Sequence, residues 1–339
     1  MIQTLIAKLF EHKSLTLDEA YEAMDTIFSG NATPAQIGAY LAALRMKGEN
    51  ADEIAGSAKA MRAKALHVQV KSERIVDVVG TGGDRSGTFN ISTTAAFVVA
   101  GAGAPVAKHG NRAASSQSGS ADVLAALGVK VDLHPEQVGR CIDEIGIGFM
   151  FAQTHHPAMK HAAGPRRELG ARTIFNILGP LTNPAGAKRQ LLGVYSGALT
   201  GLIAETLREL ESIHVLVVNG AGSVDELVLD GVNKVSELNN GAVTHFELGA
   251  QHFGLAHAGV DELGGGTPEF NAAITRSVLE DAATPARRDV VLLNAGAALY
   301  AADVAADVGS GIALARESIR SGRALAKLEA LIRLSQSVG

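Results

Sequence analysis

The stretch Val79-Gly80-Thr81-Gly82-Gly83-Asp84, followed by Thr88-Phe89-Asn90-Ile91-Ser92-Thr93, decides the fold of this 339-residue chain. The apolar run 75–79 reads as a buried strand, and helix-forming sequence resumes after Asn90. Glycines allow positive φ and a close approach of backbone N–H groups to a ligand. A helix start adds free amides and the positive end of its dipole. The stretch therefore predicts a strand, a glycine-rich turn and a helix arranged to bind phosphate.

A plain strand-to-helix turn would use the same glycines, so the neighbouring side chains decide between the two interpretations. Hydroxyl, amide and carboxylate groups crowd the turn at Asp84, Thr88, Asn90, Ser92 and Thr93. Such groups suit phosphate, ribose hydroxyls or a hard cation better than they suit a simple change of chain direction. We therefore favour the ligand-binding interpretation.

The first seventy or so residues show only helical patterns. Thr16 with Glu19, and Asn50 with Glu53, have the spacing of a capping box, and Thr33-Pro34 fits an N-cap followed by proline at the first helical position. We expect a small all-helical domain over residues 1–70, with helices from about 165–188 packing on it, and an α/β domain over 71–339.

From residue 75 onward, short apolar strands alternate with helices. The expected strands are 75–79, 105–107, 148–151, 190–194 and 213–218, and this alternation predicts a mainly parallel sheet flanked by helices. Residues 231–248 fit a hairpin near a sheet edge, and 310–335 look helical. In open sheets of this kind the ligand binds beyond the carboxyl ends of the strands, where Gly80 and Lys108 would both emerge.

Composition narrows the class of protein. A net charge of −5 without charged runs argues against a nucleic-acid binder, and no apolar run is long enough to span a membrane. Cys141 is the only cysteine, so disulfides and thiolate metal clusters are excluded and a buried thiol is expected. The N-terminus lacks the features of a signal peptide. We expect a soluble cytoplasmic protein with small-molecule substrates.

A second polar cluster follows the expected strand 105–107. It reads Lys108-His109-Gly110-Asn111-Arg112, then Ser115-Ser116-Gln117-Ser118-Gly119-Ser120. Its charges and hydroxyls suit several phosphate oxygens, and its place in the same sheet makes it a second wall of one site.

Two further groups suit charged ligands. Asp225-Glu226 lies on a loop after the strand 213–218, and adjacent carboxylates can bridge Mg²⁺ ions whose shell a polyphosphate completes. Among Arg166, Arg167 and Arg172, one guanidinium is expected to bind an anionic co-substrate and the others to pair with carboxylates, with Pro165 at a helix start. His155-His156 lacks the spacing of a zinc site, so both histidines are taken as structural or pocket-lining.

Taken together, these segments resemble the anthranilate phosphoribosyltransferase family. The resemblance also covers His156-Pro157-Ala158-Met159-Lys160, Arg166-Arg167-Glu168-Leu169-Gly170, Thr173-Ile174-Phe175-Asn176 and Asn183-Pro184-Ala185, in matching order over nearly the whole chain. It implies a homodimer that binds 5-phosphoribosyl 1-diphosphate (PRPP), two Mg²⁺ ions and anthranilate between a helical and an α/β domain.

The resemblance also implies roles for individual residues. Lys108, His109, Asp225 and Glu226 are the catalytic candidates, and Ser92, Asp225 and Glu226 are the magnesium ligands. Contacts to PRPP fall to Gly80, Gly83, Asp84, Thr88, Asn90, Thr93, Lys108, Ser116 and Ser120. Asn111 and Arg166 resemble the residues that contact anthranilate, with His109 and Gly80 lining that pocket. Ile91, Ser92, Gly110, Arg112, Ala113, Ala114 and Ser115 complete the substrate-binding set.

Two departures from the family pattern concern the site. Asn219-Gly220-Ala221-Gly222-Ser223-Val224 replaces the usual sequence before the acidic pair, which leaves the path of that loop open, and Gln153 stands where a proline is common. Two alternatives remain: a pyrimidine nucleoside phosphorylase-like enzyme, which shares a version of the glycine turn and the lysine loop, and a non-catalytic nucleotide- or nucleic-acid-binding paralogue.

Overall fold

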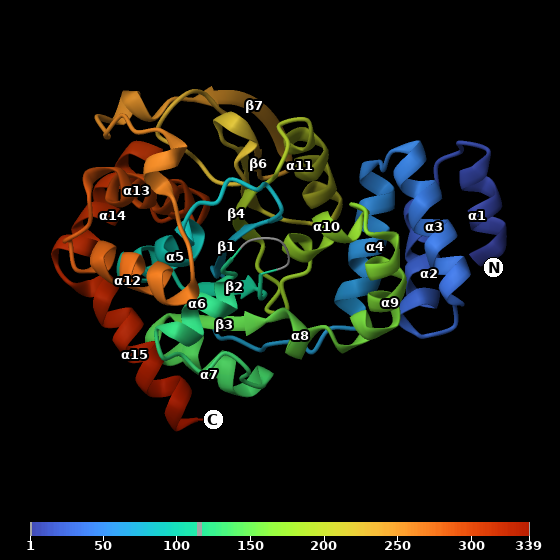
Figure 1. Ribbon diagram of the computed structural model, residues 1–339, viewed down its shortest axis with the longest axis horizontal. Helices are drawn as coiled ribbons and strands as arrows, with labels where there is room; N and C mark the ends of the chain where they lie inside the picture. The colour runs from blue at the N-terminus through green and yellow to red at the C-terminus, as the bar shows by residue number, and fades with distance from the viewer. Residues whose placement is uncertain (1, 114–116, 339) are drawn as a thin grey trace.

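A computed structural model describes residues 2–113 and 117–338 of the chain. It contains a group of helices at the N-terminal end beside a larger body built on one sheet (Figure 1). Among the described residues, no helix is both long and apolar enough to cross a membrane.

The N-terminal helices begin where the sequence predicts. They are α1 (Ile2–Phe10), α2 (Leu17–Phe28), α3 (Pro34–Lys47) and α4 (Ala51–Ala63). Thr16, Thr33 and Asn50 each close a capping box, so the predicted helix starts are confirmed. Helices α9 (Lys160–Leu169) and α10 (Phe175–Leu178) return from the rest of the chain to pack on α2, α3 and α4.

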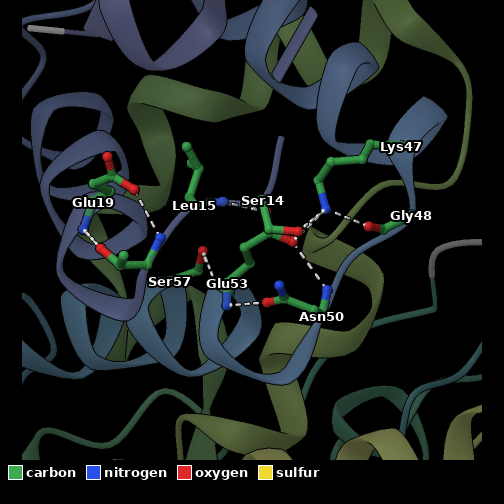
Figure 2. A network of polar contacts seen from close by, with 9 residues as sticks. Ser14, Leu15, Glu19, Lys47, Gly48, Asn50, Glu53 and Ser57 are labelled. Atoms are coloured by element: carbon green, nitrogen blue, oxygen red, sulfur yellow. Dashed lines mark hydrogen bonds and ion pairs between the residues drawn. The ribbon is translucent and has the colours of Figure 1, made fainter. Parts of the chain in front are cut away.

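A buried carboxylate joins the loops of these helices (Figure 2). Glu53 is fully buried and accepts hydrogen bonds from the backbone N–H groups of Leu15 and Asn50, both at 2.9 Å. The ammonium of Lys47 lies 2.9 Å from the second carboxylate oxygen. Each charge has its partners, which is the condition under which a buried ion pair is tolerated.

The central sheet has seven strands in the order β3-β2-β1-β4-β5-β6-β7. Its strands are β1 (Val76–Gly80), β2 (Val106–Gly110), β3 (Ile147–Phe151), β4 (Arg189–Gly193), β5 (His214–Asn219), β6 (Asn233–Asn239) and β7 (Ala242–Leu248). The first five are parallel, and β6 and β7 form an antiparallel hairpin at one edge. The predicted mainly parallel sheet and its edge hairpin are confirmed, with strand boundaries within one to three residues.

Helices cover both faces of the sheet, as expected for parallel strands. One face packs against α5 (Ile91–Gly101) and α13 (Pro285–Ala301), and the other packs against α11 (Leu199–Glu209), which also contacts α4. The hydrophobic core on the α11 side runs on without interruption into the N-terminal helices.

The remaining elements complete the larger body. They are α6 (Ser120–Ala126), α7 (Pro135–Ile145), α8 (Ala152–His155), α12 (Pro268–Leu279), α14 (Val308–Arg320) and α15 (Arg323–Ser337), with short 3₁₀ turns at 157–159, 179–181, 221–223, 250–253 and 260–263. The single helical region expected at 310–335 is two helices, because the chain turns at Gly322 with a φ of 74°. Cys141 is buried in α7, as predicted.

Candidate functional site

The glycine turn after β1 lies against the loop that carries the acidic pair. The N–H of Gly82 donates to Oδ2 of Asp225 at 2.6 Å. A Cβ on Gly80 would lie 2.5 Å from the same oxygen, and one on Gly193 would lie 1.6 Å from the Asp225 carbonyl oxygen. Gly82 and Gly83 have φ values of 68° and 73°. Glycine is therefore required here both for backbone conformation and for space.

The start of α5 meets the same loop. The backbone N–H of Ser92 donates to Oε1 of Glu226 at 3.0 Å. The carboxylate thus accepts from an N–H of the first turn, which has no partner within the helix. Asp84 accepts from the N–H of Asp225 at 3.3 Å. The glycine turn and the start of α5, which are close in sequence, thus meet the acidic loop, which lies more than 130 residues further along the chain.

The path of the acidic loop is now defined. Gly220 bridges back to Val224 through an N–H to carbonyl hydrogen bond of 2.8 Å, and the Asn219 amide donates to the carbonyl of Val194 at 2.7 Å. After the pair, the side chain of Asn294 on α13 binds the backbone of Leu227. Its Oδ1 accepts from the Leu227 N–H at 3.0 Å, and its Nδ2 donates to the Leu227 carbonyl at 2.8 Å. The unusual sequence before Asp225 therefore forms a tight, hydrogen-bonded turn.

The two carboxylates destabilise each other's charge. Burial raises the pKa of Asp225 well above its ordinary value, and the neighbouring Glu226 and Asp84 raise it further. Burial raises the pKa of Glu226 to about 7, although Lys108 and Ser92 act in the opposite direction. Buried acids of like charge favour binding of a cation between them.

The oxygen ligands fit a hard cation only when a ligand adds its own. Asp225, Glu226 and the Ser92 hydroxyl are hard donors of the kind that Mg²⁺ takes, yet they fall short of six oxygens. Within residues 2–113 and 117–338, no three His, Cys, Asp or Glu side chains form a metal-binding group. The chemistry of this donor set suits an ion shared with phosphate oxygens.

Strand β2 presents Lys108 and His109 at the same edge of the sheet. The Lys108 ammonium is buried and donates to the carbonyl of Val78 at 2.6 Å. Burial lowers its pKa, while Asp77 and Glu226 raise it. Its positive charge therefore lies within electrostatic reach of the acidic pair.

His109 points toward a different neighbourhood. Its Nδ1 lies 3.2 Å from the carbonyl oxygen of Gly179, so Nδ1 carries the proton and Nε2 is an acceptor, with no partner among the described residues. Its ring centroid lies 5.1 Å from that of His156. Burial, together with the nearby His156 and His155, holds the pKa of His109 well below its ordinary value. The imidazole is therefore neutral.

The loop after β2 is held by its own side chains. Ser120 exchanges hydrogen bonds of 3.2 Å with the backbone N–H and carbonyl of Asn111, and a Cβ on Gly110 would collide with the Ser120 hydroxyl. Asp122 binds the N–H groups of Ala113 and Gly119 and pairs with Arg112 at 2.9 Å. Ala114, Ser115 and Ser116 lie outside the described residues. Arg112 therefore has an acidic partner from α6, and its side chain is half-exposed.

The residues at the start of α5 divide into two kinds. Asn90 receives a hydrogen bond of 2.9 Å from Asn271 and donates one of 3.1 Å to the carbonyl of Ser118, while the Thr88 hydroxyl lies 3.2 Å from that of Ser86. The side chains of Ile91 and Thr93 are buried. We therefore expect those two residues to meet a ligand through backbone atoms.

The arginine cluster differs from its predicted arrangement. Pro165 lies inside α9 and does not start it. Arg166 lies over the ring of Phe175, 4.8 Å from its centroid, and no ion pair to it occurs among the described residues. Arg172 stacks on Tyr195 at 4.2 Å and donates to the Gly83 carbonyl. The prediction that the other arginines pair with carboxylates is wrong for Arg172, because a backbone carbonyl and an aromatic ring take that place.

Two residues behind Lys108 and His109, namely Asp77 and Asn183, received no individual role from the sequence. Asp77 is fully buried in β1 and bonded to the His109 N–H and to Asn183. Its signal was visible: a carboxylate in the middle of the apolar run Ile75-Val76-Asp77-Val78-Val79 needs a partner. Gln153, which stands where the family pattern commonly has a proline, is exposed on α8.

Comparison with known proteins places the chain among relatives. Residues 72–325 match the family model described as "Glycosyl transferase family, a/b domain", and residues 3–65 match "Glycosyl transferase family, helical bundle domain". The chain is 54% identical over 333 residues to an anthranilate phosphoribosyltransferase of Rhodopseudomonas palustris, covering 98% of each chain.

Solved structures agree with the sequence relatives. The crystal structure of anthranilate phosphoribosyltransferase from Thermus thermophilus is 45% identical, with a TM-score of 0.93 over 98% of this chain and 99% of that one. The enzyme from Saccharomyces cerevisiae in complex with PRPP and Mg is 29% identical, with a TM-score of 0.91 over 99% and 98% of the two chains.

Proposed function

Because this chain belongs to the anthranilate phosphoribosyltransferase family of glycosyl transferases, we propose that it transfers the phosphoribosyl group of PRPP to the amine of anthranilate, releasing diphosphate, in tryptophan biosynthesis. The observation that carries the proposal is the convergence of the glycine turn, the start of α5 and the buried acidic pair at one edge of the sheet. This edge holds two buried carboxylates of raised pKa against the glycine turn and the start of α5, an arrangement suited to a diphosphate ester bound with a cation.

The proposed PRPP half of the site follows the glycine turn and the lysine loop. Gly80, Gly83, Asp84, Thr88, Asn90 and the backbone at 91–93 hold the phosphoribosyl and diphosphate groups, together with Lys108 and the loop 110–120. Ser92, Asp225 and Glu226 hold two Mg²⁺ ions. When bound, these ions neutralise the charge that develops on the departing diphosphate.

The proposed anthranilate half lies around His109. Asn111 and Arg166 bind the carboxylate of the acceptor, and Gly80 and His109 line the pocket. Arg166 suits this task because its planar guanidinium lacks a carboxylate partner among the described residues and is already oriented by Phe175.

The chain's own groups act mainly by position and charge. Lys108 stabilises the diphosphate as its bond to C1 of the ribose breaks, and an arylamine is neutral at pH 7, so it attacks without a strong base. His109 takes the proton released after the bond forms. The low pKa of His109 is compatible with this role, because an arylammonium ion is much more acidic than an alkylammonium ion.

The remaining proposals concern organisation. The chain divides into a helical domain, residues 1–70 with α9 and α10 packed on it, and an α/β domain over 71–339. It works in the cytoplasm as a homodimer. The apolar side chains of Phe10 and Met46, exposed by 65% and 80% on α1 and α3, support an interface on the helical domain. Light scattering of the purified protein tests the dimer.

A turnover assay tests the function. We expect the fluorescence of anthranilate to fall only when protein, PRPP and Mg²⁺ are all present, and to stay constant when phosphate and a pyrimidine nucleoside replace PRPP. Turnover of the nucleoside instead would identify a phosphorylase. Absence of both reactions, with tight binding of single-stranded DNA at moderate salt, would indicate a non-catalytic paralogue.

A further inference from the structure

The strands β1 and β2 are neighbours in the sheet, but their ladder stops early. They pair only at Val76↔Val106, whereas β1 with β4, and β2 with β3, pair over five residues each. The interrupted part of the ladder lies beside the carboxyl ends of the strands, where Lys108 and His109 emerge. Lys108 and His109 remain paired with β3, so the interruption means that on the β1 side their positions are set by something other than backbone pairing.

Side chains take the place of the missing backbone bonds. If the parallel register continued, Val78 would donate to the Ala107 carbonyl and accept from the His109 N–H. Instead, the Ala107 carbonyl accepts from Nδ2 of Asn183 at 2.8 Å, and the His109 N–H donates to Oδ1 of Asp77 at 3.1 Å. The Val78 carbonyl accepts from the Lys108 ammonium at 2.6 Å.

Asp77 and Asn183 also hold each other. Nδ2 of Asn183 donates to Oδ2 of Asp77 at 2.7 Å, and its Oδ1 accepts from the N–H of Ala185 at 2.9 Å. The pair therefore ties β1, β2 and the segment 179–185 into one unit. That segment also supplies the Gly179 carbonyl that fixes the proton of His109 on Nδ1.

We propose that Asp77 and Asn183 form a positioning pair that sets the places of Lys108 and His109 for phosphoribosyl transfer. The inference rests on the proposed function. Successive residues of a strand point to opposite faces, so one buried contact on the His109 backbone orients both side chains: Lys108 toward the acidic pair and His109 toward Gly179 and His156.

A purely structural role does not explain the choice of residues. The other three parallel strand pairs, β1 with β4, β2 with β3 and β4 with β5, are each joined by a ladder of five residue pairs and need no side-chain bridge of this kind. A fully buried carboxylate is a costly substitute, and burial raises the pKa of Asp77 to about 6 although Lys108 opposes the shift. A costly side-chain bridge at this point is understandable if the separation of β1 and β2 matters for the reaction.

The test compares Asp77→Asn and Asn183→Ala with Ser318→Ala. Asp77→Asn keeps the side-chain volume but replaces one of the two carboxylate acceptors, which bind the His109 N–H and Nδ2 of Asn183, by an NH₂ donor. Ser318 is also fully buried and bonds the Val98 carbonyl at 2.8 Å, at the end of α5 away from the site. All three variants lose a buried hydrogen bond, and only the first two lose the bridge.

We expect kcat to fall about 100-fold in Asp77→Asn, the loss associated with small displacements of catalytic groups. The KM values for PRPP and anthranilate should change by less than about threefold, because most of the groups proposed to hold the substrates, among them Gly83, Asp84 and Arg166, lie on other segments. Asn183→Ala should behave alike, and the double variant should lose no more than the worse single variant, since the two residues act as one unit.

Three outcomes separate the possibilities. Wild-type protein that does not turn over PRPP and anthranilate would remove the proposed function itself. Active wild-type protein with normal kcat in a folded Asp77→Asn, or a loss of kcat matched by Ser318→Ala at equal thermal stability, would overturn the positioning pair alone. If Asp77→Asn does not fold, Asn183→Ala decides the question from the other side of the bridge.

Discussion

Two regions of this molecule bury carboxylates, and they do so in opposite ways. Glu53, among the N-terminal helices, is surrounded by donors: two backbone N–H groups and the Lys47 ammonium lie at 2.9 Å (Figure 2). Asp225 and Glu226 have one backbone N–H each and lie beside Asp84 and each other. Glu53 is paired within the fold, whereas the acidic pair is left short of positive charge.

The difference separates structure from function. A buried carboxylate with a full set of donors stabilises a particular arrangement of loops, and its removal leaves those donors unsatisfied. Carboxylates that repel each other reduce stability, so they persist where a ligand supplies the missing charge. Substitutions in the two regions should therefore move different quantities.

The largest effect is expected at the acidic pair. Asp225→Asn with Glu226→Gln should lower kcat by about 10³- to 10⁴-fold, on the order of 5 kcal/mol in barrier height, because the cation that stabilises the leaving diphosphate is lost. The free energy of unfolding without Mg²⁺ should hold or increase, since the repulsion is removed. Steady-state kinetics over a range of Mg²⁺ concentrations test this, and an unchanged Mg²⁺ dependence would contradict the assignment.

At Glu53 we expect a loss of stability and little change in turnover. Glu53→Ala should lower the free energy of unfolding by about 4 kcal/mol, because it strands the buried Lys47 ammonium and two N–H groups. The turnover of the protein that remains folded should be close to normal. Urea denaturation measures the loss, and Glu144→Ala is the control: Glu144 pairs with Arg140 on the surface, where a change of less than about 0.5 kcal/mol is expected. Equal losses in both variants would refute the distinction.

The next largest effect is expected in the pH dependence of the free energy of unfolding. In the folded protein the pKa of Glu226 is raised from 4.5 to about 7, so between these pH values the folded state keeps a proton that the unfolded chain releases. Stability from this group is therefore full below pH 4.5 and is lost as the pH rises to 7, by about 3 kcal/mol.

Urea denaturation at pH 5 and pH 7.5, in the presence of a chelator, measures that slope. Glu226→Gln should make it shallower, and because the variant keeps Asp77 and Asp225, whose pKa values are also raised, the difference between the two proteins belongs to Glu226. A slope that is the same in wild type and variant would show that Glu226 is not protonated near neutral pH.

The sequence predicts this contrast only in part. Local signals were sufficient for the helix starts at Thr16, Thr33 and Asn50, because a capping box is contained within four residues. The glycine turn was also readable, since its conformation and its spacing to the helix are local. The strands and the edge hairpin followed from periodic apolar runs.

What the sequence could not supply is contact between distant segments. Nothing near Asp77 in the chain shows that Asn183, 106 residues later, comes to meet it. Pro165 was misplaced for a related reason. Pro165 is buried inside α9 beyond the first turn, where it cannot donate the usual backbone hydrogen bond, so its burial in the tertiary fold, and not local helix preference, places it there. Side-chain partners are set by the tertiary fold, which no single segment encodes.

The smallest effect is expected at Arg166, where the comparison of buried charged groups extends from carboxylates to a cation. Like the acidic pair, it forms no ion pair within 4 Å among the described residues, and burial lowers its pKa. Arg166→Ala should therefore raise the KM for anthranilate about tenfold, which is about 1.4 kcal/mol, with little change in the KM for PRPP. The neighbouring Arg167 is exposed on α9, so Arg167→Ala should leave both values unchanged. Equal increases in the two KM values for Arg166→Ala would place this guanidinium on the wrong substrate, and the argument that a buried charge without a partner marks a ligand site would then hold for the acids but fail for the arginine.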